Sequence, residues 1–102
     1  MENLKASAII NIKENPNQLM VNGTVITYYD DDKLIVSKSN PQGINPTILL
    51  LYVKIYKGSG PMKGTQKQFI YLSNDTKINS YKKVCIITQT GLSLTVDIEM
   101  FA

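Results

Sequence analysis

The sequence lacks three side chains that carry much of protein chemistry, and it has very little of a fourth. There is no histidine, no tryptophan and no arginine, and cysteine occurs once. Without histidine the usual general base near neutral pH is missing, which excludes Ser-His-Asp and Cys-His catalysis. Without histidine and with one cysteine, the common tetrahedral zinc sites cannot form. A single cysteine also excludes an internal disulfide. We therefore expect no catalytic residues, no metal site and no cofactor.

The absence of arginine bears on nucleic acids, because arginine makes the commonest specific contact to guanine. All eleven basic residues are lysine, so the sequence does not favour sequence-specific readout of DNA. The longest apolar run, residues 48–53, is far short of the roughly 20 residues that span a bilayer. No cationic start followed by an apolar stretch marks a secretory signal, so a cytoplasmic location is favoured.

What is present is a globular balance, with 43% hydrophobic and 19% charged residues over 102 positions, which fits one domain at residues 1–102. Apolar residues alternate with polar ones almost throughout, and this period of two predicts β-strands. An Asn22-Gly23 pair between two apolar runs predicts a tight hairpin turn. The predicted strands cover residues 6–13, 18–21, 24–29, 33–37, 47–57, 66–73, 81–88 and 92–101.

Seven to eight short strands with frequent turn signals predict an all-β fold. The expected architecture is an antiparallel β-sandwich, immunoglobulin-like or jelly-roll-like, with a small β-barrel as the alternative. Residues 14–17 and 39–46 read as a turn and a long loop, because both are rich in proline and asparagine. Residues 74–80 read as a polar link with one short helical turn.

The middle of the chain is rich in lysine and tyrosine, and it carries the candidate binding residues. If residues 50–57 and 66–73 pair as a hairpin, their alternate side chains share one face of a sheet. Aromatic rings between cations hold single-stranded nucleic acid by stacking and charge. The plainer interpretation is a solvated sheet face. The candidates are Tyr52, Lys54, Tyr56, Lys63, Lys67, Phe69 and Tyr71.

Two short segments have both a ligand-binding and a structural interpretation. The glycine-rich tip at residues 58–64 contains Lys63; its backbone amides suit an anion, but a mobile or protein-binding tip is the plainer interpretation. The run Asp30, Asp31 and Asp32 has carboxylates for Ca²⁺, but it lacks the alternate spacing of a calcium loop and reads as a solvated turn. Cys85 lies in an apolar strand, where cysteine acts as a small hydrophobe.

Self-association has its own signals at the two ends of the chain. Both ends are predicted strands, which can add to the sheet edge of a neighbour. Ile9, on the polar face of its strand, and Phe101 are apolar where a monomer prefers polar residues, so they mark either a contact patch or packing under a loop.

The sequence therefore predicts a non-catalytic small β-domain, not an enzyme, that acts by protein–protein binding or self-assembly, as an adaptor, inhibitor or structural component. The alternative is single-stranded nucleic-acid binding through the Tyr/Lys face of the central hairpin. A glycan-binding module that stacks sugars on tyrosine ranks third, and an enzyme fourth.

Overall fold

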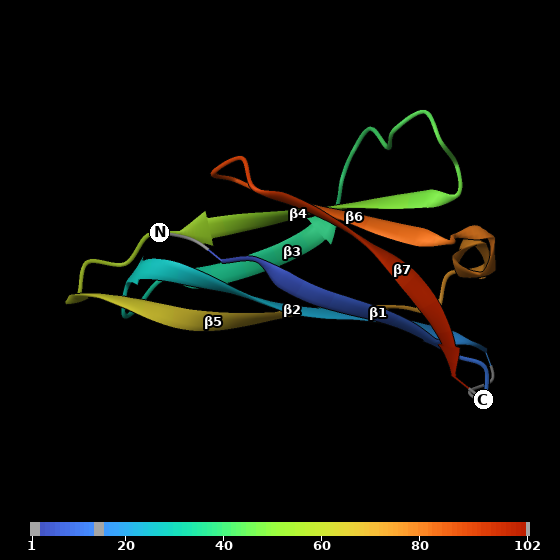
Figure 1. Ribbon diagram of the computed structural model, residues 1–102, viewed down its shortest axis with the longest axis horizontal. Helices are drawn as coiled ribbons and strands as arrows, with labels where there is room; N and C mark the ends of the chain where they lie inside the picture. The colour runs from blue at the N-terminus through green and yellow to red at the C-terminus, as the bar shows by residue number, and fades with distance from the viewer. Residues whose placement is uncertain (1–2, 14–15, 102) are drawn as a thin grey trace.

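A computed structural model describes residues 3–13 and 16–101, apart from the side chains of Thr76 and Phe101. The protein is all-β, and its described residues form seven strands and one short 3₁₀ helix (Figure 1). The predicted helical turn in residues 74–80 is confirmed. The elements are β1 (Lys5–Asn11), β2 (Gln18–Tyr29), β3 (Lys33–Lys38), β4 (Ile48–Tyr56), β5 (Met62–Ser73), η1 (Thr76–Ser80), β6 (Lys83–Thr88) and β7 (Ser93–Phe101).

The strands form one sheet in the order β3-β4-β6-β7-β1-β2-β5, and its two edge strands, β3 and β5, contact each other without pairing. The sheet is thus nearly closed, which confirms the prediction of a β-sandwich or small barrel. The pairing is mixed and not wholly antiparallel, since β1 runs parallel to β7 and β4 runs parallel to β6. Parallel neighbours need a long connection, and most of the chain separates β1 from β7.

The core lies inside the flattened barrel, where the strands turn their inward residues toward one another. The Cα atoms extend only 17 Å along the shortest axis, close to the thickness of two sheets packed about 10 Å apart. The alternation seen in the sequence selects these inward positions, because successive side chains of a strand point to opposite faces. The buried cluster comprises Ala8, Ile10, Leu19, Val21, Leu49, Leu51, Val53, Phe69, Ile78, Val84 and Ile86.

The predicted hairpin turn at Asn22-Gly23 is wrong, because β2 runs through both residues without a break. Gly23 is instead paired with Ala6 on one side and with Phe69 on the other. A Cβ atom at position 23 would lie 2.5 Å from Cζ of the Phe69 ring and would also meet the backbone oxygen of Lys5. Glycine is needed there for a close approach inside a sheet, which is its second common role in strands.

The terminal strands are not edges, so the expectation that they add to a neighbour's sheet edge is wrong. Figure 1 shows β1 and β7 side by side, and both lie in the interior of the strand order. The edges belong to β3 and β5. Of the predicted turn at residues 14–17, positions 14 and 15 lie outside the described residues, as does the side chain of Phe101.

Candidate functional site

The outward surface of β1, β2 and β5 is almost free of charge, and we call it the β1–β2–β5 face. Strand register places its residues in rows across the three strands. Lys5, at one end of β1, is the one charged residue among the positions that make up this face. These positions are Lys5, Ser7, Ile9, Asn11, Gln18, Met20, Asn22, Thr24, Ile26, Gln66, Gln68, Ile70 and Leu72.

An apolar row crosses all three strands of this face. Ile9 is paired with Met20, and Met20 is paired with Leu72, so the three side chains are direct neighbours. Ile70 lies one outward position along β5 from Leu72, and each of these two side chains is 52% exposed. An apolar cluster on the outside of a sheet marks a contact surface when its members adjoin one another. The expectation that Ile9 points out of the core is confirmed.

The outward surface of β3, β4, β6 and β7 differs in charge. Lysines stand on it at positions 33, 54 and 83, and Lys83 donates to the Asp97 carboxylate at 2.6 Å in an exposed ion pair. Ile35 on β3 is 53% exposed, but its direct neighbour on β4 is Lys54. The contrast between the two surfaces follows from residue choice at outward positions, since the strands of both surfaces alternate in the same way.

The hairpin assumed between residues 50–57 and 66–73 is wrong. Strand β4 pairs with β3 and β6, whereas β5 pairs with β2. Pairing partners are set by the whole topology, and two strands that are consecutive in sequence have separated here into different parts of the sheet. The predicted Tyr/Lys set is therefore divided between two places.

Three of the predicted residues remain together on the outward surface of β4, at alternate positions. Tyr52 is half-buried between its register neighbours Ser37 and Ile87, and Tyr56 is exposed. The ammonium of Lys54 lies over the Tyr56 ring, 5.0 Å from its centroid. A cation over the ring occupies the surface on which a base would stack.

The other candidates belong to β5. Phe69 is buried in the core against Gly23, and the half-buried Tyr71 packs against the core. The Lys67 ammonium donates to the backbone oxygen of Asp30, and Lys63 is exposed near the start of the strand. The outward residues that sequence reasoning missed on this strand are Ile70 and Leu72. Their signal was the strand's own alternation, which sets them opposite Phe69 and Tyr71.

The aspartate run and the glycine-rich tip bind each other, and we call this contact the aspartate clasp. The Asp31 carboxylate accepts hydrogen bonds from the amides of Ser59 (3.1 Å) and Gly60 (2.9 Å). The buried Asp32 carboxylate accepts from the amides of Gly58 (2.7 Å) and Tyr29 (2.9 Å). The amides that suit an anion are thus already occupied by the chain's own carboxylates.

These contacts shift both acids in the same direction. The amides of Gly60 and Ser59 lower the pKa of the Asp31 carboxyl below its usual value. Burial alone would raise the pKa of the Asp32 carboxyl, but hydrogen bonds from Gly58, Tyr29 and Thr27 outweigh burial and lower it. Both groups are therefore anionic at neutral pH and tie the β2–β3 turn to the β4–β5 loop.

Two further observations bear on chemistry. Cys85 is a free, half-buried cysteine on β6, between buried Val84 and Ile86. Within residues 3–13 and 16–101, no three side chains of the histidine, cysteine, aspartate or glutamate types gather as metal ligands would.

No helix in the described part of the chain has the length and apolarity to cross a membrane.

Two pockets lie at the two ends of the barrel. One, of about 310 Å³, is lined among others by Asp32, Ile55 and Gln89. Two of its polar side chains bind backbone groups, since Asp32 belongs to the aspartate clasp and the Gln89 side chain accepts from the Ile55 amide at 2.9 Å. The other, of about 430 Å³, lies beside η1 at the opposite end.

The fold and these surfaces define a small, nearly closed β-barrel domain whose β1–β2–β5 face carries a single charge. The chain matches no protein-family model, no curated protein and no solved structure. The case for its function therefore rests on its own residues.

Proposed function

We propose that this chain is a non-catalytic domain that works by binding protein through the β1–β2–β5 face, and that the partner is a second copy of the chain. The observation that carries the proposal is the composition of the face. It has one lysine at one end and an apolar row of Ile9, Met20 and Leu72 at its centre. Interface centres are depleted in charge and surrounded by polar residues in this way.

The exposed apolar residues favour contact with another molecule. Ile70 and Leu72 leave about half of their side-chain surface in water. Covering apolar surface contributes roughly 25 cal/mol for each Å² removed from water. Asn11, Gln18 and Asn22 next to the row both donate and accept hydrogen bonds, so they can pair across an interface. The row ends at Ile9, whose neighbour on β7 is the exposed Glu99, so a charge lies at the rim of the face and not between the three apolar residues.

Charge argues that the partner is a second copy. The chain carries eleven lysines against eight acids, a net charge of +3, so two copies repel wherever their lysines meet. Two identical copies related by a two-fold axis bring the same patch together, which requires a patch that does not repel itself. Among the sheet surfaces of residues 3–13 and 16–101, the β1–β2–β5 face meets this requirement best, because only Lys5 is charged there.

The size of the face sets the strength of the expected dimer. Strands lie about 4.8 Å apart and rise about 3.3 Å per residue. Three strands over the length of β1 therefore present roughly 330 Å² of flat area per copy. Two copies together would cover roughly 660 Å², about two thirds of the roughly 1,000 Å² typical of stable interfaces, so we expect a weak dimer that dissociates on dilution.

A dilution series followed by amide NMR tests this proposal. As the concentration falls from about 1 mM to about 20 μM, amides of outward residues on β1, β2 and β5 should shift together along one binding curve. Amides of β3, β4 and β6 serve as the internal control and should stay fixed. No concentration dependence, or shifts spread evenly over all seven strands, would contradict the proposal. If the amides of this face shift only when a different protein is added, the face is a contact surface but its partner is not a second copy of the chain.

Single-stranded nucleic acid is the second candidate, supported by the three β4 residues that share the other surface with Lys33. It predicts that a labelled oligonucleotide shifts at low salt and that the shift disappears as salt releases its counterions. Replacing Tyr52 and Tyr56 together with alanine should abolish the shift. If the variant still shifts the oligonucleotide to the same extent, the outward surface of β4 does not bind nucleic acid.

A further inference from the structure

The pocket beside η1 has walls that the chain holds in place. Its volume is about 430 Å³, and it lies between the β3–β4 loop and η1, which Figure 1 shows at the same end of the molecule. The residues lining it are Lys38, Gln42, Gly43, Asn45, Pro46, Ile48, Lys77, Ser80 and Tyr81.

The loop wall is fixed by two side chains that bind backbone groups. The Gln42 amide donates to the backbone oxygen of Leu50 at 3.0 Å and accepts from its N–H at 2.9 Å, so it continues the sheet beyond the end of β3. The Asn45 side-chain oxygen accepts from the N–H and the hydroxyl of Thr47, at 2.9 and 2.7 Å, just before β4 begins. The loop is thus pre-organised before any ligand arrives.

The opposite wall, η1, is anchored in the barrel. Ile78 is 1% exposed and belongs to the core cluster, and Asp75 caps the helix by accepting from the Lys77 amide at 3.0 Å. Lys77 therefore stands on an element whose position is set by core packing.

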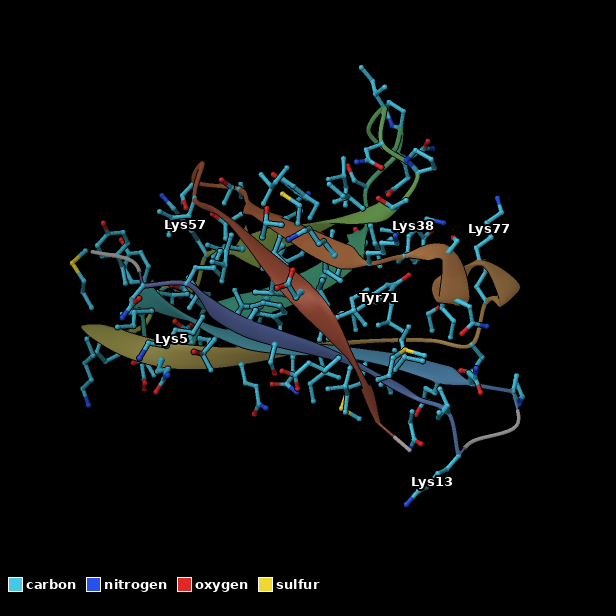
Figure 2. The ribbon with its side chains drawn as sticks, turned by 45° about the vertical axis from the view of Figure 1, so that its right-hand side comes forward. Lys5, Lys13, Lys38, Lys57, Tyr71 and Lys77 are labelled. Carbon is cyan, nitrogen blue, oxygen red and sulfur yellow. The ribbon has the colours of Figure 1, made fainter. Side chains whose placement is uncertain are left out.

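Two lysines face this pocket from the two walls. Lys38 ends β3 and Lys77 stands on η1; Figure 2 shows both at one end of the molecule, with Lys57 at the other. Within residues 3–13 and 16–101, the ammonium groups of Lys38 and Lys77 make no hydrogen bond or ion pair. Among the described residues no acid lines the pocket, and Asp75, the nearest in sequence to Lys77, lines a different one. The pocket is thus positive and its cations are available.

We propose that this pocket binds a phosphate monoester of a small molecule, with the phosphate between Lys38 and Lys77. A phosphate monoester carries close to two negative charges at neutral pH, whereas a carboxylate carries one. Lysine binds phosphate as a point charge, and two point charges on separate walls fit a dianion better than a monoanion. Tyr81, Pro46 and Ile48 supply apolar surface for the organic part of the ligand.

Phenyl phosphate and benzoate test the proposal as a matched pair of probes, since both carry a phenyl ring and they differ in charge. Phenyl phosphate should bind saturably with a dissociation constant of roughly 1 mM, and benzoate at least about tenfold more weakly. Amide NMR should place the shifts at residues 42–48 and 77–81. Lys38→Gln and Lys77→Gln should each weaken phenyl phosphate binding roughly threefold to tenfold.

Lys57→Gln is the control variant, because Lys57 is also exposed but lies at the other end of the barrel. It should bind phenyl phosphate as the unmodified chain does. The proposal is overturned if phenyl phosphate causes no saturable shift at the pocket, or if benzoate binds equally well. It is also overturned if Lys57→Gln weakens binding as much as Lys38→Gln, since binding would then reflect overall charge.

Discussion

Single residues fix two close contacts in this protein, and neither depends on a large side chain. At Gly23 the absence of a Cβ atom lets the Phe69 ring lie against the backbone of β2. At Asp31 and Asp32, short carboxylates reach across to the amides of residues 58–60 and join two loops. Both contacts make specific demands on the residue type, so both can be tested by single substitutions.

Replacing Gly23 with alanine should destabilise the protein by about 1–3 kcal/mol, because the new methyl group overlaps the Phe69 ring and a backbone oxygen. Urea unfolding measures the change. Gly43→Ala is the matched control, since its added Cβ would meet only the end of the Leu50 side chain, at 3.1 Å, which can move. Equal stabilities for Gly23→Ala and the unmodified chain would contradict the close approach.

The aspartate clasp predicts how stability depends on pH. The pKa values of Asp31 and Asp32 are lower in the folded protein than in the unfolded chain. Their contribution is therefore complete above the usual aspartate range and is lost as the pH falls toward the lowered pKa values. Urea unfolding should show the free energy of unfolding falling between about pH 5 and about pH 2.

Asp32→Asn should lose about 1–3 kcal/mol at neutral pH, because the buried site then lacks a charged acceptor, and its decline toward low pH should be shallower. Asp97→Asn is the control, since that carboxylate is exposed and pairs with Lys83 on the surface. It should keep the steep decline of the unmodified chain. If the free energy of unfolding of Asp32→Asn falls with pH as steeply as that of the unmodified chain, the Asp32 carboxylate does not stabilise the aspartate clasp.

Secondary-structure elements show what the sequence could and could not predict. Alternation is a local property, so it located the strands and placed Ile9 on an outward position. The polar link at residues 74–80 predicted the short helical turn before β6. The prediction failed at Asn22-Gly23, because the same glycine signal serves a turn or a close contact within a strand, and only the packing of Phe69 distinguishes them.

The pairing of strands could not be predicted either, because it depends on contacts between residues that are distant in sequence. The apolar row of Ile9, Met20 and Leu72 exists only because β1, β2 and β5 are neighbours in one register. Strand β5 is far from β1 and β2 in sequence, and a shift by one residue would turn each side chain to the other face. The Tyr/Lys set was grouped on the assumption that consecutive strands pair, which is the commonest arrangement but not the one found here.

At the scale of an element, η1 should behave as part of the core and not as a surface link. Ile78→Ala should lower the free energy of unfolding by about 2–5 kcal/mol, because it leaves a cavity at the end of the barrel. Ile44→Ala makes the same chemical change on the β3–β4 loop, where the side chain is fully exposed, and should have little effect. Similar losses in the two variants would show that η1 is not anchored by Ile78.

The molecule as a whole carries a lysine-bearing surface, the β1–β2–β5 face and the pocket beside η1. In the proposed dimer, the β1–β2–β5 face lies between the copies, and the lysine-bearing surface of β3, β4, β6 and β7 points away from the contact. The pocket beside η1 and the apolar row have no residue in common, so variants can change ligand binding and dimer formation separately. The central claim is that the β1–β2–β5 face is a contact surface between copies.

Sedimentation velocity over a range of concentrations tests this claim most directly, with a lysine placed on one surface or the other. Ile70→Lys and Ile35→Lys change residues that are 52% and 53% exposed, so the two variants match in chemistry and in burial. The unmodified chain and Ile35→Lys should move from the 11.4 kDa monomer toward twice that mass as concentration rises, whereas Ile70→Lys should stay monomeric. A monomer at every concentration, or a dimer lost equally in both variants, would contradict the account.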